Sequence, residues 1–270
     1  MRRFIPFALV LLLGACVAAP RPTPPLTAEQ GRTAWAKSIE IALGEWQRFG
    51  GQVVHLRTDA EGNEVNAIDP VRRWEDARDA YDPLIRYWAA VGEDPTSFDS
   101  WRDCSSGWRR KCPWQLPWSA AFISYVMQAA GLSTYDFPPS AEHWEYLKGL
   151  IKRARRPGAV FVAEPIDRYA PAPGDLICKT RAGADAPPFD ALVADPDRFG
   201  GSLPMHCDLV IANDGSGARP DGRIEAIGGN VLNSVSKSIL PTAAGLLERG
   251  RGGQWFVILR NVFGAGAPVS

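Results

Sequence analysis

Ser119 is the first of several residues whose type and position suggest chemistry. It follows Pro117 and Trp118 and opens a stretch that is apolar almost all round, ending at the stop signal Gly131. This pattern predicts a helix in the middle of a domain, whose free backbone N–H groups and positive dipole end stabilise negative charge beside Ser119. Ser119 is therefore a candidate nucleophile. Serine is also a preferred helix cap, so partners elsewhere in the chain must decide between the two roles.

His206 and Asp208 are candidates for the partners of such a nucleophile. His206 begins a predicted strand, and the two-residue period of a strand places Asp208 on the same face. If the next strand, residues 223–227, forms a hairpin with it, Asn230 returns to the neighbourhood of His206. Either Asp208 or Asn230 would then hold the imidazole by its second nitrogen while His206 takes the proton of Ser119.

Three further residues are expected to contact a substrate. Trp118 precedes the candidate nucleophile, and His143 lies in a short predicted helix. Arg181, with Lys179 nearby, stands at the start of a long aperiodic segment, 181–204, and would bind a carboxylate. The alternatives are a solvent-facing position for His143 and a solvated basic surface for Arg181 and Lys179.

Helices precede strands in the predicted order of elements. The expected helices begin at Thr27, Asp69, Ser119 and Ser140; the first ends at Gly50-Gly51, and Pro83 breaks or restarts the second. The expected strands lie at residues 159–162, 175–179, 207–211, 223–227 and 255–259, with a strand or extended loop at 53–56. We expect a single α+β domain over residues 27–270, with N-terminal helices packed on an antiparallel sheet.

The N-terminus has the features of an export signal. A basic start, residues 1–3, precedes an apolar run, residues 4–13, that is shorter than the roughly 20 residues needed to span a bilayer. The run ends in Leu13-Gly14-Ala15-Cys16, which resembles the lipobox of bacterial lipoproteins. We therefore expect removal of residues 1–15 and lipidation of Cys16. An ordinary secretory signal with an incidental cysteine is the alternative.

Export and lipidation predict a location in the cell envelope. Residues 16–26 are rich in proline and form a semi-rigid tether between membrane and domain in this interpretation. Val17 after the cysteine resembles the pattern of lipoproteins sorted to the outer membrane. The domain would then face the periplasm.

Export makes disulfides the expected state of the four remaining cysteines, because disulfides persist outside the cytosol. Cys104 and Cys112 flank a short polar loop, and a disulfide between them would stabilise the fold by about 2–3 kcal/mol. Cys178 and Cys207 lie in two predicted strands and form either a second disulfide, which we favour, or two buried thiols. The spacing lacks the short paired gaps of a zinc site, so no metal is expected.

The composition is that of a folded domain without charge bias. The chain has 270 residues, of which 46% are hydrophobic, and 30 Lys and Arg balance 30 Asp and Glu. This balance gives no reason to expect a nucleic-acid partner. No nucleotide-binding glycine motif is evident, and we expect no cofactor.

Four motifs in sequence resemble those of the papain-like NlpC/CHAP amidohydrolases. Residues 117–124 resemble the helix that carries the catalytic cysteine of that family, Pro-Trp-Cys-Ala-Ala-Phe-Val-Ser in type. The other matching segments are Pro173-Gly174-Asp175-Leu176-Ile177, His206-Cys207-Asp208-Leu209-Val210, and Ile227-Gly228-Gly229-Asn230 with Ser234-Val235-Ser236. The resemblance covers about residues 114–238 and implies a papain-like fold.

Ser119 stands where the family has its nucleophilic cysteine. A serine hydroxyl is far less acidic than a thiol and must lose its proton during attack, so His206 would act as a true general base. The resemblance implies hydrolysis of amide bonds in peptidoglycan peptides by acyl transfer, with helix N–H groups holding the oxyanion. The alternative is a non-catalytic domain that binds peptidoglycan or a partner protein, in which Ser119 only caps its helix.

Overall fold

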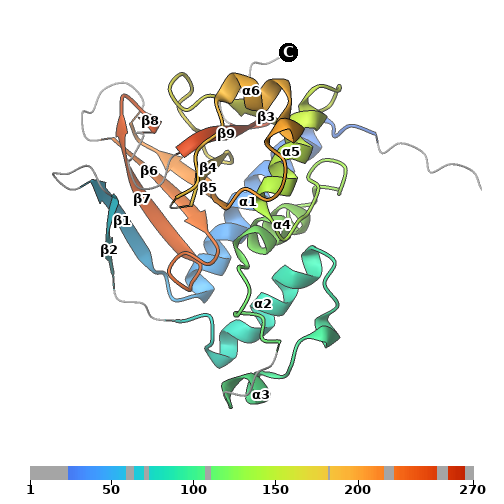
Figure 1. Ribbon diagram of the computed structural model, residues 1–270, viewed down its shortest axis with the longest axis vertical. Coiled ribbons are helices and arrows are strands. Elements are labelled where there is room, and N and C mark those ends of the chain that lie inside the picture. The colour runs from blue at the N-terminus through green and yellow to red at the C-terminus, as the bar shows by residue number, and fades with distance from the viewer. Residues whose placement is uncertain are drawn as a thin grey trace, which may run out of the picture.

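Helices packed against one nine-stranded sheet form the described part of the protein (Figure 1). The computed structural model describes residues 24–58, 64–69, 73–106, 111–181, 183–215, 222–247 and 255–264. The expected signal peptide and the lipidation site Cys16 lie outside the described residues. None of the helices within these ranges is long and apolar enough to cross a membrane.

Six α-helices are present among the described residues. They are α1 (Ala28–Arg48), α2 (Arg78–Ala90), α3 (Trp101–Ser105), α4 (Ser119–Ala129), α5 (His143–Ala154) and α6 (Phe189–Ala194), with 3-10 turns η1 (Pro95–Ser97) and η2 (Pro196–Phe199). Thr27 and Gln30 form a capping box at the start of α1, as expected for a helix that begins there. The elements α6 and η2 lie in the segment that was expected to lack regular structure.

Two helix boundaries differ from the sequence-based expectation. Helix α2 begins at Arg78 rather than Asp69, and it continues through Pro83 because the residues after the proline pack in the core against α4. Helix α5 begins at His143 rather than Ser140. The Ser140 hydroxyl accepts a hydrogen bond from the backbone N–H of Glu142 and so forms a turn before the helix.

The sheet is mixed rather than wholly antiparallel. Its strands are β1 (Val53–Thr58), β2 (Glu64–Ile68), β3 (Phe161–Glu164), β4 (Leu176–Thr180), β5 (Met205–Asn213), β6 (Arg223–Gly228), β7 (Ser236–Ala243), β8 (Leu246–Leu247) and β9 (Trp255–Asn261). Their order is β2-β1-β7-β6-β5-β4-β9-β3, with β8 beside β7. All pairs are antiparallel except β1 with β7. The long chain between these two strands supplies the crossover that a parallel pair requires, which corrects the antiparallel expectation.

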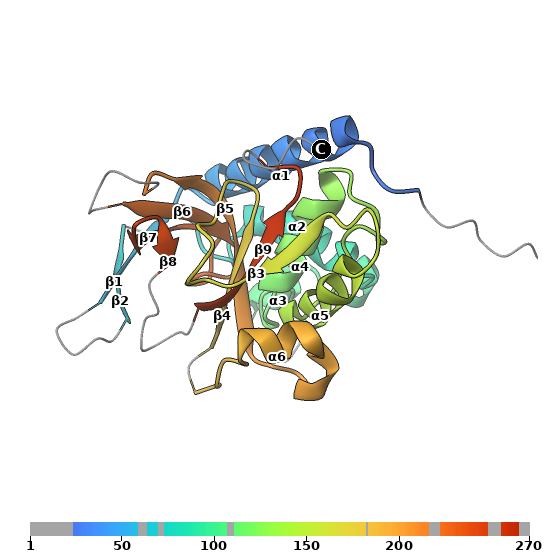
Figure 2. The ribbon, with the colours of Figure 1, turned by 90° about the horizontal axis from the view of Figure 1, so that it is seen from above.

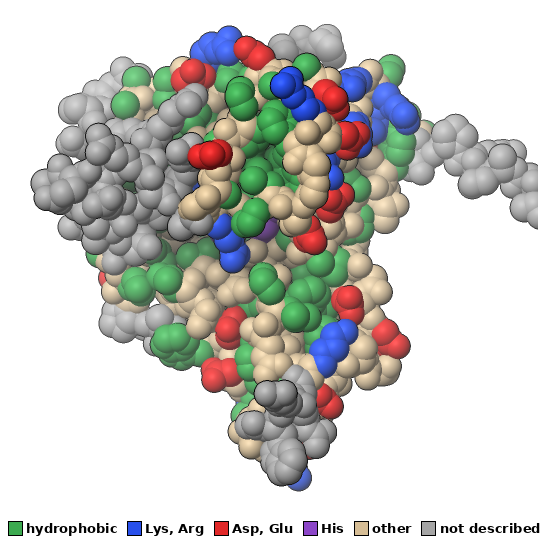
Figure 3. All heavy atoms as spheres, in the orientation of Figure 1, with side chains coloured by type: hydrophobic (Ala, Val, Ile, Leu, Met, Phe, Trp, Pro, Cys, Tyr) green, Lys and Arg blue, Asp and Glu red, His purple; other side chains and the backbone are tan. Residues whose placement is uncertain are grey.

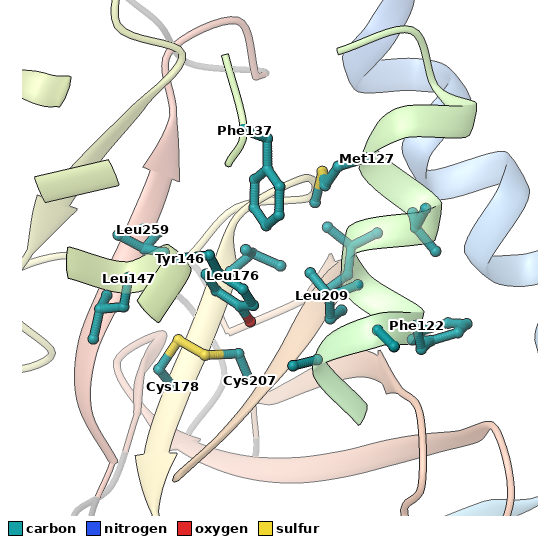
Figure 4. Close-up of a cluster of buried hydrophobic side chains, with 14 of the residues drawn as sticks. Phe122, Met127, Phe137, Tyr146, Leu147, Leu176, Cys178, Cys207, Leu209 and Leu259 are labelled. Carbon is teal, nitrogen blue, oxygen red and sulfur yellow. A yellow bond between two sulfur atoms is a disulfide. The ribbon is translucent and has the colours of Figure 1, made fainter. Parts of the chain in front are cut away.

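The sheet buries apolar side chains on both faces. On one face, Leu176 and Leu209 pack with residues of α4 and α5 in the larger core (Figure 4). On the other face, Ile177 and Val210 belong to a separate apolar cluster. Figure 2 shows α4 and α5 on one side of the strands, with the β1–β2 hairpin at the far end of the molecule. Helix α4 is therefore enclosed between the sheet and the other helices, as its apolar sequence predicts.

Both expected disulfides are confirmed. Cys104–Cys112 closes the end of α3 onto the segment that leads to α4. Cys178–Cys207 joins directly opposed positions of β4 and β5, with 4.2 Å between the Cα atoms (Figure 4). The second disulfide fixes the backbone on either side of Cys207, including that of its neighbours His206 and Asp208.

Candidate functional site

The hydroxyl of Ser119 is hydrogen-bonded to a histidine. Ser119 is the first residue of α4, and its Oγ lies 2.7 Å from Nε2 of His143, the first residue of α5. The N-cap of α4 is Trp118, and no side chain caps this helix. The hydroxyl is therefore not used as a cap, and no side chain in the described part of the chain bonds the N-terminal N–H groups of α4.

His143 links Ser119 to a buried tyrosine. Its Nδ1 lies 2.5 Å from the hydroxyl oxygen of Tyr146, one helical turn along α5. With the proton on Nδ1, His143 donates to Tyr146 and its Nε2 accepts from the Ser119 O–H; the other tautomer reverses both bonds. Only the first tautomer makes His143 a base for Ser119.

The surroundings of His143 favour the neutral imidazole. Burial lowers the pKa of His143 well below its ordinary value of 6.5, and nearby His206 and Arg181 lower it further. Burial also raises the pKa of Tyr146 well above 10.0, and the charge of Asp208 adds to this effect. At neutral pH the chain Ser119–His143–Tyr146 is therefore uncharged.

His206 and Asp208 form a second hydrogen-bonded pair beside this chain. His206 Nε2 lies 2.6 Å from Asp208 Oδ1, and the His206 ring stands edge-on to the His143 ring with 5.2 Å between centroids. Of the two expected orienting residues, Asp208 bonds the imidazole. Asn230 makes no hydrogen bond to His206 in the described residues. In the structure, Ser119 is therefore hydrogen-bonded to His143, and His206 lies beyond His143. This corrects the expected Ser119–His206 pair.

His206 and Asp208 line a surface pocket of about 210 Å³. A second pocket, of about 310 Å³, is lined by residues 114–117, which lead directly to Ser119. Arg181 and Asn230 line both pockets and so stand where the two meet. We call the two pockets together the groove. Figure 3 shows one face of the molecule, with a histidine side chain near its middle next to a basic side chain.

Two glycines at the end of β6 let it approach the site closely. A Cβ on Gly228 would overlap Asp208 Oδ1 and lie 3.0 Å from His206 Nε2. A Cβ on Gly229 would lie 2.5 Å from Cβ of Phe122 in α4. The Gly-Gly pair therefore supports the site by its lack of side chains, which keeps β6 against both His206 and the Ser119 helix.

Gly228→Ala is expected to separate His206 from Asp208 and to destabilise the fold by about 1–3 kcal/mol, the usual cost of overpacking. Urea unfolding measures the stability, and hydrolysis or peptide binding measures the site. The matched control is Gly44→Ala, because a Cβ at Gly44 in α1 meets nothing within 4 Å. That variant should be at least as stable as the wild type. Equal stability of Gly228→Ala and wild type would contradict the tight approach.

The three residues that were expected to contact a substrate differ in whether they reach the groove. Trp118 is fully buried, and its indole N–H donates to Glu75 Oε2 at 2.7 Å, so it supports the core rather than a binding surface, and the expectation for it is wrong. His143 is also buried, because its ring turns inward to Ser119. Arg181 is exposed and lines the groove.

Two residues of the site were not anticipated from the sequence. Tyr146 is three residues after His143, a spacing that places both on one face of a helix. Glu75 accepts the Trp118 bond and lines the second pocket, and burial raises its pKa. No sequence signal connects Glu75 to Ser119. No group of three or more His, Cys, Asp or Glu among the described residues could hold a metal ion.

Comparison with known proteins identifies one family. The sequence matches DUF2272, described as an uncharacterized protein conserved in bacteria, over residues 73–260. Searches of curated proteins and of solved structures found no match. The matched segment contains Ser119, His143, His206 and Asp208, and it is more than half of the chain. The chain therefore belongs to the bacterial DUF2272 family.

Proposed function

We propose that this protein is a cell-envelope hydrolase that cleaves amide bonds of peptidoglycan peptides by acyl transfer to Ser119. The observation that carries the proposal is the 2.7 Å separation of Ser119 Oγ and His143 Nε2 at the start of a buried helix. This distance is within the hydrogen-bond reach of a nucleophile and its base, about 2.6–3.2 Å. A hydroxyl that served only packing would not need an imidazole there.

In the proposed acylation step, Ser119 Oγ attacks the substrate carbonyl and His143 Nε2 takes the hydroxyl proton. His143 then gives that proton to the leaving amine as the C–N bond breaks. Water next attacks the acyl-enzyme, His143 accepts its proton, and Ser119 leaves with the proton returned. Tyr146 accepts from Nδ1–H throughout and keeps the imidazole in the required tautomer.

The start of α4 supplies stabilisation for the tetrahedral oxyanion. The N–H of Phe122 is already bonded to the Trp118 carbonyl, whereas the N–H groups before it lie in the first turn and have no intrahelical acceptor. Those of Ser119 and Ala120 are adjacent to Oγ. Together with the positive end of the helix dipole they favour negative charge on the substrate oxygen.

The resemblance to the NlpC/CHAP amidohydrolases supports the class of reaction and a papain-like fold. Ser119 lies at the start of a buried helix that packs on the sheet, and His206 is the second residue of β5 in that sheet, as in the motif order of that family. Our proposal departs from the resemblance at the base, because His143 rather than His206 bonds the nucleophile. The His206–Asp208 pair then lines the groove, and His206 adds to the effect of burial in lowering the pKa of His143.

The proposed location follows from the N-terminal sequence. Lipidation of Cys16 would hold the protein at a membrane, and Val17 favours the outer membrane. Residues 16–26 would space the domain from the bilayer, facing the periplasm and its peptidoglycan. Globomycin sensitivity of processing and labelling with a fatty-acid analogue in cells test the anchor, and Cys16→Ser is expected to abolish both.

Incubation of the purified protein with muropeptides and, separately, with a fluorophosphonate probe tests the activity. The expected result is a new amine and a new carboxylate in the muropeptide products, and a covalent phosphonate on Ser119 found by mass spectrometry. Labelling of another residue, or neither labelling nor cleavage, would overturn the proposal.

A non-catalytic binding domain is the second candidate, and two observations favour it. Ser119 is only 2% exposed, and the lowered pKa of His143 makes the imidazole a weak base. Such a domain would bind peptidoglycan or a partner through the groove. Unchanged binding to cell-wall sacculi in Ser119→Ala, together with absent labelling in the wild type, would favour this candidate.

A further inference from the structure

We infer that the groove binds a peptide end in which a free carboxylate adjoins an apolar side chain, with Arg181 holding the carboxylate. The inference deepens the proposed function, since the bound end lies next to Ser119, but it concerns binding and can be tested without turnover. It rests on the position of Arg181, on the walls of the first pocket and on the backbone of the turn at Leu232.

Arg181 presents a guanidinium to the groove, and no carboxylate of the described residues is paired with it. Its backbone N–H donates to the Pro204 carbonyl, which anchors the residue directly after β4. Its side chain is exposed, lines both pockets and forms no ion pair within the ranges that the structure describes. A guanidinium offers two parallel N–H groups to a carboxylate, the geometry that this side chain recognises best.

The first pocket combines that guanidinium with an apolar wall. Val54 and Leu56 from β1 and Leu232 from the turn after β6 line it together with Arg181. Its volume of about 210 Å³ is below the roughly 300–1,000 Å³ typical of pockets for drug-sized ligands, so it takes the end of a chain rather than a whole molecule. A terminal residue places its carboxylate and its side chain on one carbon, which matches this close pairing of a cation and hydrocarbon.

The turn after β6 holds Leu232 in an unfavourable backbone conformation. Leu232 has φ +52°, and its neighbours Asn230 and Asn233 have φ +56° and +60°. Asparagine tolerates this region, whereas for leucine it is uncommon and costs energy. Leu232 is nonetheless 39% exposed and directed at the pocket rather than at the core. An exposed apolar side chain kept at a strained position indicates contact with a ligand.

The charges along the groove set the direction of the bound chain. The second pocket contains the carboxyl group of Glu75, which would repel a substrate carboxylate. Arg181 lines both pockets, and the first pocket also contains Lys179 and Asp208, whose carboxylate is already bonded by His206. The carboxylate end therefore occupies the first pocket, and the chain continues through the second pocket past residues 114–117 toward Ser119.

Binding is measured by calorimetry in the Ser119→Ala background, so that no turnover occurs. The probes are N-acetyl-Ala-Ala-Leu with a free carboxylate, its C-terminal amide, and N-acetyl-Ala-Ala-Gly with a free carboxylate. We expect the free acid to bind at least about tenfold more tightly than the amide, as one charge-assisted pair provides. Arg181→Gln is expected to remove this preference, whereas Arg168→Gln, at a 69% exposed side chain outside the groove, should keep it.

The variant Leu232→Asn tests the apolar contact independently of the charge of Arg181. Asparagine accepts the positive φ, so the variant should fold at least as stably as the wild type, yet lose about fivefold or more of the preference for Leu over Gly at the peptide end. Equal binding of acid and amide, no binding of either, or an acid preference that survives Arg181→Gln would overturn the inference. Failure of Ser119 labelling with intact acid preference would instead overturn only the proposed hydrolysis.

Discussion

Ser119→Ala is expected to lower hydrolysis and fluorophosphonate labelling by at least about 10³-fold, because the variant lacks the atom that forms the acyl bond. Stability should change little. The lost hydroxyl makes one hydrogen bond, worth about 1 kcal/mol, and its partner His143 keeps its bond to Tyr146. Rates with a chromogenic ester and with muropeptides measure the first effect, and thermal unfolding measures the second.

Ser124→Ala is the matched control, since it makes the same change in the same helix. Ser124 is buried like Ser119, but its hydroxyl bonds the backbone of Ser140 and no imidazole. The control should label and hydrolyse like the wild type. If Ser119→Ala kept its activity, or if Ser124→Ala lost it equally, Ser119 would not be the nucleophile.

The strands with apolar runs in their sequence were predictable, whereas β2, β7 and β8 were not predicted. Strands β3, β4, β5, β6 and β9 all overlap the expected ranges. Strand β7 was missed because its buried positions include Ser236, Ser238 and Thr242. Burial alternates along this strand, but hydropathy does not. The parallel pairing of β1 with β7 could not be predicted from the sequence either, because it depends on a crossover connection rather than on a local sequence pattern.

Some residues of the candidate site were predicted from the sequence, but their pairing was not. Ser119, His206 and Asp208 were marked by motif and strand period, and the latter two do form a hydrogen-bonded pair. His143 was expected near the site, but a helix placed three residues too early hid its position at the first turn of α5 and its spacing from Tyr146. Which imidazole reaches Ser119 is decided by how α5 packs on the sheet, which no spacing along the chain encodes.

His143→Gln is expected to reduce acylation by about 10²–10⁴-fold, the usual contribution of a positioned general base. His206→Gln should have a smaller effect, because His206 does not bond Ser119 and glutamine can still bond Asp208. His55→Gln is the control, since His55 lies in β1 and its side chain is partly exposed. A wild-type rate in His143→Gln with a large loss in His206→Gln would return the role of base to His206.

The pH dependence of acylation distinguishes the two histidines further. Because burial, His206 and Arg181 lower the pKa of His143 below 6.5, its imidazole remains an unprotonated base on the acid side of that value. The acid limb of kcat/KM should therefore lie below pH 6.5. In His206→Gln a neighbouring positive charge can no longer form, so the pKa of His143 rises and the acid limb moves toward 6.5, while in His55→Gln it stays in place.

The unfolded chain binds this proton more readily than the folded one, so acid pH also destabilises the fold, and circular dichroism at each pH must show the folded state. Loss of the acid limb in His206→Gln would mean that His206, rather than the histidine bonded to Ser119, titrates in catalysis.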